Sequence, residues 1–225
     1  MPYFLILLIS LAGLLVCAEP LPARVHISYQ ARLGSLPIGR AEQRWQLDGA
    51  HYTLNTELTP ILGPRIRYIS HGDIAAGGLV PLDYAEYRNN ETTPRRFVRF
   101  DWAKQQASFG NGDAQETAAL EAGAQELNTL PFQLAWLGDK AQIKMQIATG
   151  RKLRHDSFTS QMGNSLTLRG KQWDARSWRS GEGEDRTEVW LAPGLANLPI
   201  KIIRSDEHGE LQLVAQSIDI EPEKP

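Results

Sequence analysis

The sequence predicts a mainly β protein, built as an antiparallel β-barrel or strongly curved sheet with one covering helix. Three observations point to this class. Apolar and polar residues alternate along most of the chain, which is the period of β-strands. The alternating segments are short and follow one another with Gly or Pro between them, as in sandwiches and barrels. One segment has helical spacing instead.

The first expected strand is RVHISYQARLG, in which one face carries Val25, Ile27, Tyr29, Ala31 and Leu33. The stretch Ile38–Glu57 then reads as a hairpin, with Trp45 and Tyr52 on its apolar face. Asp48-Gly49 marks its turn, because Gly readily takes the positive φ that a type I′ turn requires. We expect this hairpin to be half-buried, apolar inside and charged outside.

The alternation continues through a series of further segments. In GGLVPLDYAEYR we expect Leu82 and Tyr84 on one face. The weakly patterned stretch 109–125 could separate two halves of a sheet. The other expected strands lie in RIRYISHGDI, RRFVRFDW, AQIKMQI, GNSLTLRG, KQWDARSW, RTEVWLAP, PIKIIRS and GELQLVAQSIDI.

The exception to the alternation lies between Ala122 and Gly138. Its leucines recur at helical spacing, at Leu127, Leu130, Leu134 and Leu137. Asn128 or Thr129 is the expected N-cap and Pro131 falls in the first turn, where proline is tolerated. The pattern predicts one helix that plugs or covers the sheet.

The first 18 residues predict a signal peptide. Phe4–Ala18 is an uncharged apolar run shorter than the ~20 residues of a membrane span, and it ends in an A-x-A-like site at Ala18. A lipoprotein modified at Cys17 and an uncleaved anchor are the alternatives. With cleavage after Ala18, residues 19–225 form a single β domain without cysteine and without a transmembrane span.

Composition and charge exclude several classes of function. The net charge is −2, with 24 basic and 26 acidic residues, so we expect no binding to nucleic acid. Two basic segments, 94–100 and 151–155, are interpreted as solvated strand faces. Cys17 is the only cysteine, which excludes thiol chemistry in the mature chain.

A search for catalytic groups finds no nucleophile elbow, zinc-protease motif or phosphate-binding loop. Glu182, Glu184 and Asp185 lack the spacing of a calcium loop and read as a charged hairpin tip. We therefore expect no enzyme, no cofactor and no metal. The histidines are scattered among polar neighbours and are interpreted as unrelated surface residues: His26, His51, His71, His155 and His208.

Aromatic residues carry the strongest hint of a binding site. They fall on the inward face of consecutive expected strands, at Trp45, Tyr52, Tyr68, Tyr84 and Phe100. One interpretation is a packed core, since aromatic residues at this period usually contact each other. The other is a cavity in which these five residues bind a small apolar ligand.

The chain resembles the bacterial DUF3108 family of exported domains. The resemblance covers about Val25 to Ile220 and rests on LPIGRAEQRWQLDGAHYTL, SHGDIAAGGLVPLDY, FDW, AQELNTLPFQLAW and EVWLAPGLANLPIKI. Glu126 and Asn128 stand where the family pattern would have an acid followed by Ser. The resemblance implies a periplasmic β-rich fold and supplies no catalytic residues. Such a fold resembles periplasmic open barrels that carry lipids or lipoproteins.

Two functions are therefore expected. The first is a binding or carrier protein for an apolar, lipid-like ligand held against the inward aromatic residues. The second is an interaction or scaffold module in cell-envelope assembly, acting on an envelope protein through an exposed strand edge or apolar patch.

Overall fold

The computed structural model describes residues 21–112, 114–181, 186–206 and 209–221. The predicted signal peptide and Cys17 lie outside the described residues. Besides the helix, discussed below, and a 3₁₀ turn at Pro193–Leu195, the elements are strands. In chain order these are β1 (Arg24–Leu33), β2 (Leu36–Asp48), β3 (His51–Pro60), β4 (Ile66–Ala75), β5 (Gly78–Arg88), β6 (Arg96–Asp101), β7 (Gln106–Asn111), β8 (Ala114–Ala119), β9 (Gln125–Glu126), β10 (Gln142–Ala148), β11 (Leu153–Leu168), β12 (Lys171–Ser180), β13 (Thr187–Ala192), β14 (Leu198–Asp206) and β15 (Gly209–Glu221).

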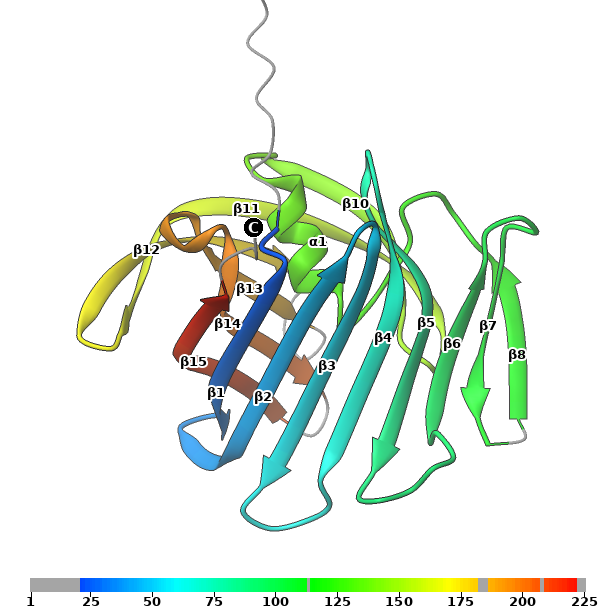
Figure 1. Cartoon of the computed structure of the whole chain (residues 1–225), viewed down its shortest axis with the longest axis horizontal. Helices are drawn as coiled ribbons and strands as arrows, with labels where there is room; N and C mark the ends of the chain where they lie inside the picture. Colours follow the sequence, from blue (N-terminus) through cyan, green and yellow to red (C-terminus); the bar gives the residue numbers. More distant parts are fainter. Residues whose placement is uncertain (1–20, 113, 182–185, 207–208, 222–225) are drawn as a thin grey trace, which may run out of the picture.

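The strands form one 15-stranded sheet in the order β8-β7-β6-β5-β4-β3-β2-β1-β15-β14-β13-β12-β11-β10-β9. Neighbours are antiparallel, except that β9 runs parallel to β10. The two halves of the chain meet where β1 pairs with β15, and Figure 1 shows the first half curving in front of the second. The predicted class is thus confirmed as a curved, unclosed sheet. The stretch 109–125 runs between its two halves, as expected, and contains the edge strand β8 and the first residue of the edge strand β9.

The helix α1 (Leu130–Leu137) lies between the two halves and contacts β5, β9, β13 and β14 (Figure 1). Its first six residues are all buried, so it is a plug rather than an amphipathic cover. Thr129 is the N-cap and Pro131 lies in the first turn. The predicted stripe was too long at its start. Leu127 precedes the helix, because the Glu126 carboxylate accepts backbone N–H bonds from the next residues and holds a turn there.

Two clusters of buried apolar residues form the core. The larger cluster fills the space between the two halves of the sheet and surrounds α1; it includes Trp45, Tyr52 and Phe132. The smaller lies on β5 to β7 and the segments beside them and includes Tyr84 and Phe100. The inward face predicted from the alternation is therefore shared by two separate clusters.

The hairpin between β2 and β3 has its turn where the sequence predicts it, with Asp48 opposite His51. Its type differs from the prediction. Of the two loop residues only Gly49 has a positive φ, 59°, and Ala50 does not. A single positive φ at the first loop position is the pattern of a type II′ turn, not of type I′.

The expectation that Leu82 and Tyr84 share a face is wrong. Pairing between β4 and β5 shifts at this point, where Asp83 and Pro81 face successive residues of β4 and Leu82 is left out of the register. A β-bulge of this kind re-aims the extra side chain. Leu82 is 41% exposed, whereas Tyr84 is buried.

Candidate ligand-binding groove

Three of the five predicted aromatic residues lie in packed surroundings. The Trp45 ring stacks on Tyr52 at 5.1 Å and on Phe132 of α1 at 4.8 Å between centroids. Phe100 stacks on Trp102 at 5.8 Å. The helix thus fills the space over Trp45 and Tyr52, and these side chains act as core.

The other two aromatic residues, Tyr68 and Tyr84, line open space. Their rings stack at 6.3 Å. Above them lies a hollow of about 340 Å³, here called the groove, whose wall also includes Leu33, Leu127 and Leu211. A narrower cavity of about 50 Å³ continues inward from the same two tyrosines. The groove is within the size range of small-molecule sites, about 300–1,000 Å³, and the inner cavity is not.

A buried polar network forms the inner wall of the cavity. Asn128 accepts a hydrogen bond from Thr56 Oγ1 at 2.7 Å and donates one to Ser70 Oγ at 2.9 Å. The Glu126 carboxylate accepts bonds from the backbone N–H groups of Asn128, at 2.5 Å, and Thr129, at 2.9 Å. Burial raises the pKa of Glu126. The network ties the segment before α1 to β3 and β4, which fixes the floor of the site.

Arg204 on β14 lies where the groove, the inner cavity and a third hollow meet, since it lines all three. Its guanidinium donates to the Leu127 carbonyl, while its Nε atom is shielded from solvent and has no hydrogen-bond partner. Burial lowers the pKa of Arg204, and it raises those of Tyr68 and Tyr84. Among the described residues, no carboxylate lies within ion-pair distance of Arg204.

The third hollow, of about 410 Å³, is here called the basic mouth. Its wall takes residues from both basic segments of the sequence, so the interpretation of these segments as solvated strand faces was incomplete. Arg151 and Lys152 are exposed, but Arg96 and Arg154 are partly buried. Asp206 is the one carboxylate among the described lining residues. The cations of the wall are Arg96, Arg151, Lys152, Arg154, Arg186 and Arg204.

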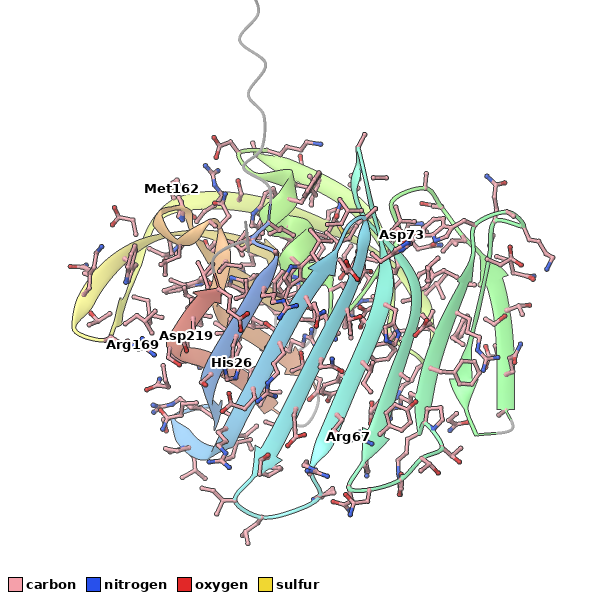
Figure 2. All side chains as sticks on the ribbon, viewed as in Figure 1. His26, Arg67, Asp73, Met162, Arg169 and Asp219 are labelled. Carbon is pink, nitrogen blue, oxygen red and sulfur yellow. The ribbon has the colours of Figure 1, made fainter. Side chains whose placement is uncertain are left out.

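The described histidines are not brought together, and Figure 2 shows His26 well apart from Asp73, the partner of His51. Each pairs with a different carboxylate: His26 with Glu42, His51 with Asp73, His71 with Asp83 and His155 with Glu121. The described part of the chain contains no group of three metal-ligating side chains that could hold an ion. Its one α-helix is also too short to cross a membrane. Glu182, Glu184, Asp185 and His208 lie outside the described residues.

The fold and the site together define a barrel-like, open β domain with a hollow on its concave side. The chain belongs to the DUF3108 family, described as a protein of unknown function, which matches residues 28–216. The predicted family is thereby confirmed. The fold is similar to a β-barrel-like protein of the domain of unknown function DUF1849 from Brucella abortus, with a TM-score of 0.51, 10% identity, and coverage of 89% of this chain and 99% of that one. No curated protein matches.

Sequence reasoning missed Arg204, although a signal was present. In PIKIIRS, Ile200, Ile202 and Arg204 fall at period two, so the arginine continues a buried apolar face. A cation in that position is unusual enough to mark a site. The convergence of the two basic segments had no comparable signal, since more than 50 residues separate Arg96 from Arg151.

Proposed function

We propose that this protein is a periplasmic, non-catalytic binding or carrier protein for an apolar, lipid-like ligand held in the groove. The observation that carries the proposal is the open hollow of about 340 Å³ above Tyr68 and Tyr84. The helix α1 fills the space over the neighbouring part of the same inward face, so the open space is confined to the surroundings of Tyr68 and Tyr84. Leu33 and Leu211 continue its apolar wall toward the outside.

A non-catalytic role fits the groups around the groove. The described histidines contribute to none of the three adjoining hollows. Glu126 lies behind Asn128, and its two short backbone bonds are structural in character. General acid–base catalysis needs a titratable group within reach of a bound ligand. The groove wall has two carboxylates: Glu86, which lies 3.9 Å from the guanidinium of Arg96, and Asp206, which is exposed. Beside them the groove offers apolar surface and the two cations Arg96 and Arg204, which suit binding.

Native mass spectrometry tests this proposal. Residues 19–225 are purified from a periplasmic extract without detergent, and the intact mass is compared before and after extraction with organic solvent. We expect an additional mass that the solvent removes and that lipid analysis identifies. A variant with Leu211→Trp, which fills the groove, should lose this mass. Ile220→Trp is the matched control, since Ile220 lies on the same strand and is exposed.

A bare mass for the wild-type chain, or one that L211W leaves unchanged, would contradict the carrier proposal. It would favour the second candidate, an interaction or scaffold module in envelope assembly. One observation supports that candidate: the exposed apolar side chains Leu36, Ile61 and Leu62 gather on two adjacent hairpins, where Ile61 N–H donates to the Ile38 carbonyl. Leu62 is 88% exposed.

Site-specific crosslinking tests the scaffold candidate. A photoreactive residue at Leu62 should crosslink one defined envelope protein in living cells, whereas the same residue at Leu82, also exposed but on β5, should not. Equal or absent crosslinking at the two positions would count against a scaffold surface at the hairpin tips.

A further inference from the structure

The charge of Arg204 is only partly compensated by the groups that contact it in this structure. One guanidinium nitrogen donates to the Leu127 carbonyl, and Nε is shielded without a partner. An arginine stays protonated in a protein and offers five N–H donors. A partly buried cation of this kind is costly unless an anion compensates it. No carboxylate among the described residues lies at ion-pair distance from Arg204.

The other cations of the basic mouth differ from Arg204 in their partners. Arg154 pairs with Asp156 at 3.1 Å, and Arg186 pairs with Glu210. Arg96 lies 3.9 Å from Glu86, a carboxylate of the groove wall. These pairs neutralise much of the deeper wall. Arg204 is the cation left at the junction with the groove.

The outer part of the basic mouth adds two exposed cations. Arg151 and Lys152 lie in the turn between β10 and β11, and neither forms an ion pair with a described residue. Against them stands Asp206, which is exposed on the same wall. Cations that outnumber carboxylates in a hollow raise the local concentration of anions. The groove therefore has apolar side chains at Leu33 and Leu211, and at Arg204 it adjoins the positive basic mouth. Its own wall also carries Asp206 and Glu86, the second of which faces Arg96.

We propose that the ligand of the groove is an anionic amphiphile, whose carboxylate or phosphate oxygens accept hydrogen bonds from Arg204 while its apolar chain lies over Tyr68 and Tyr84 toward Leu33. This inference rests on the proposed carrier function and adds the class of the ligand. The planar guanidinium suits either oxyanion, because both can accept two parallel N–H bonds. The head group would face Arg151 and Lys152.

Four probes separate charge from chain: decanoate, decyl phosphate, decanol and inorganic phosphate. Their dissociation constants are measured by isothermal titration calorimetry on residues 19–225 after removal of any endogenous ligand. We expect decanoate and decyl phosphate to bind at least about tenfold more tightly than decanol, the gain expected of a charge-assisted hydrogen bond. We expect inorganic phosphate to bind more weakly than decyl phosphate.

Variants then locate the anion. Arg204→Met removes the charge but keeps an apolar stem, and it should weaken decanoate binding at least about tenfold while leaving decanol unchanged. Arg44→Met is the matched control, since Arg44 is exposed on β2 outside all three hollows. If R204M does not fold, the double variant R151Q/K152Q and the comparison of decanoate with decanol in the wild type still test the inference.

The outcomes distinguish this inference from the proposed function. Equal binding of decanol and decanoate, or no effect of R204M, overturns the anionic class but leaves a carrier of apolar ligands. Binding of none of the ten-carbon probes overturns both. Inorganic phosphate binding as tightly as decyl phosphate supports an anion site at Arg204 for a free anion, and overturns the amphiphile.

Discussion

Two neighbouring regions of the same concave face differ in packing: one is filled and the other is open. Around Trp45 the face is closed, because Phe132 of α1 stacks on the indole and fills the space. Around Tyr68 and Tyr84 it is open, because no residue of α1 lines the groove and the segment before the helix contributes only Leu127 to its wall. The strands carry similar aromatic residues in both regions. Whether such a face becomes packed core or an open hollow is decided by what a distant segment places on it.

The largest effect is expected in the closed region. Trp45→Ala removes a ring that is 2% exposed and stacked on two neighbours, so we expect a loss of about 3–5 kcal/mol in the free energy of unfolding. Urea unfolding followed by circular dichroism measures it. A loss below about 1 kcal/mol would mean that Trp45 is not packed as described.

The next largest effect on stability is expected at Gln133, whose hydrogen bonds hold the helix over this region. Gln133 of α1 accepts a hydrogen bond from Leu79 N–H at 2.7 Å and donates one to the Gly77 carbonyl at 3.1 Å. Gln133→Ala leaves the Leu79 N–H on β5 and the Gly77 carbonyl just before β5 without partners, at a cost of about 1–3 kcal/mol. The same urea titration checks it, and an unchanged midpoint would show that water replaces the amide at little cost.

The open region should respond differently. Tyr68→Ala should lower stability by only about 1–2 kcal/mol, because part of the ring already faces open space. The affinity of the Tyr68→Ala variant for decanoate should also fall, and this loss should be clearer than the loss of stability. If Tyr68→Ala destabilises as much as Trp45→Ala and leaves binding unchanged, the two regions are both core and the comparison fails.

A pH effect on stability should arise from Glu126, which belongs to the buried polar network between the two regions. The folded-state pKa of Glu126 lies above its ordinary value of 4.5 because of burial. The stability contributed by the protonated group is therefore present in full below pH 4.5 and is lost as the pH rises through the folded pKa. Unfolding free energies measured from pH 4 upward should fall less steeply for Glu126→Gln than for the wild type. Identical slopes would contradict this.

The smallest effect is expected at the bulge. Leu82→Ser should change stability by no more than about 0.5 kcal/mol, because the side chain points outward. Leu79→Ser, on the same strand but 2% exposed, should cost clearly more and serves as the comparison. Equal losses would indicate that Leu82 packs inward, as the alternation alone predicts.

The sequence predicts much of this fold for a simple reason: period-two patterning reports directly on which face of a strand is buried. It predicts the hairpin at Gly49 and the helical segment near Leu130. It fails at Leu82, since a bulge shifts the period without changing residue types. It also could not separate Trp45 from Tyr68, because the difference depends on where Phe132, more than 60 residues away, is placed. Arg204 was visible in the pattern, but its surroundings were not.

The most direct test of the comparison is an isotope-filtered NMR experiment on the ¹³C-labelled protein with unlabelled decanoate. The account predicts nuclear Overhauser contacts between the methylene protons of decanoate and the rings of Tyr68 and Tyr84, and none with Trp45 or Tyr52. Contacts with Trp45 and Tyr52 instead, or no contacts at saturating decanoate, would contradict it.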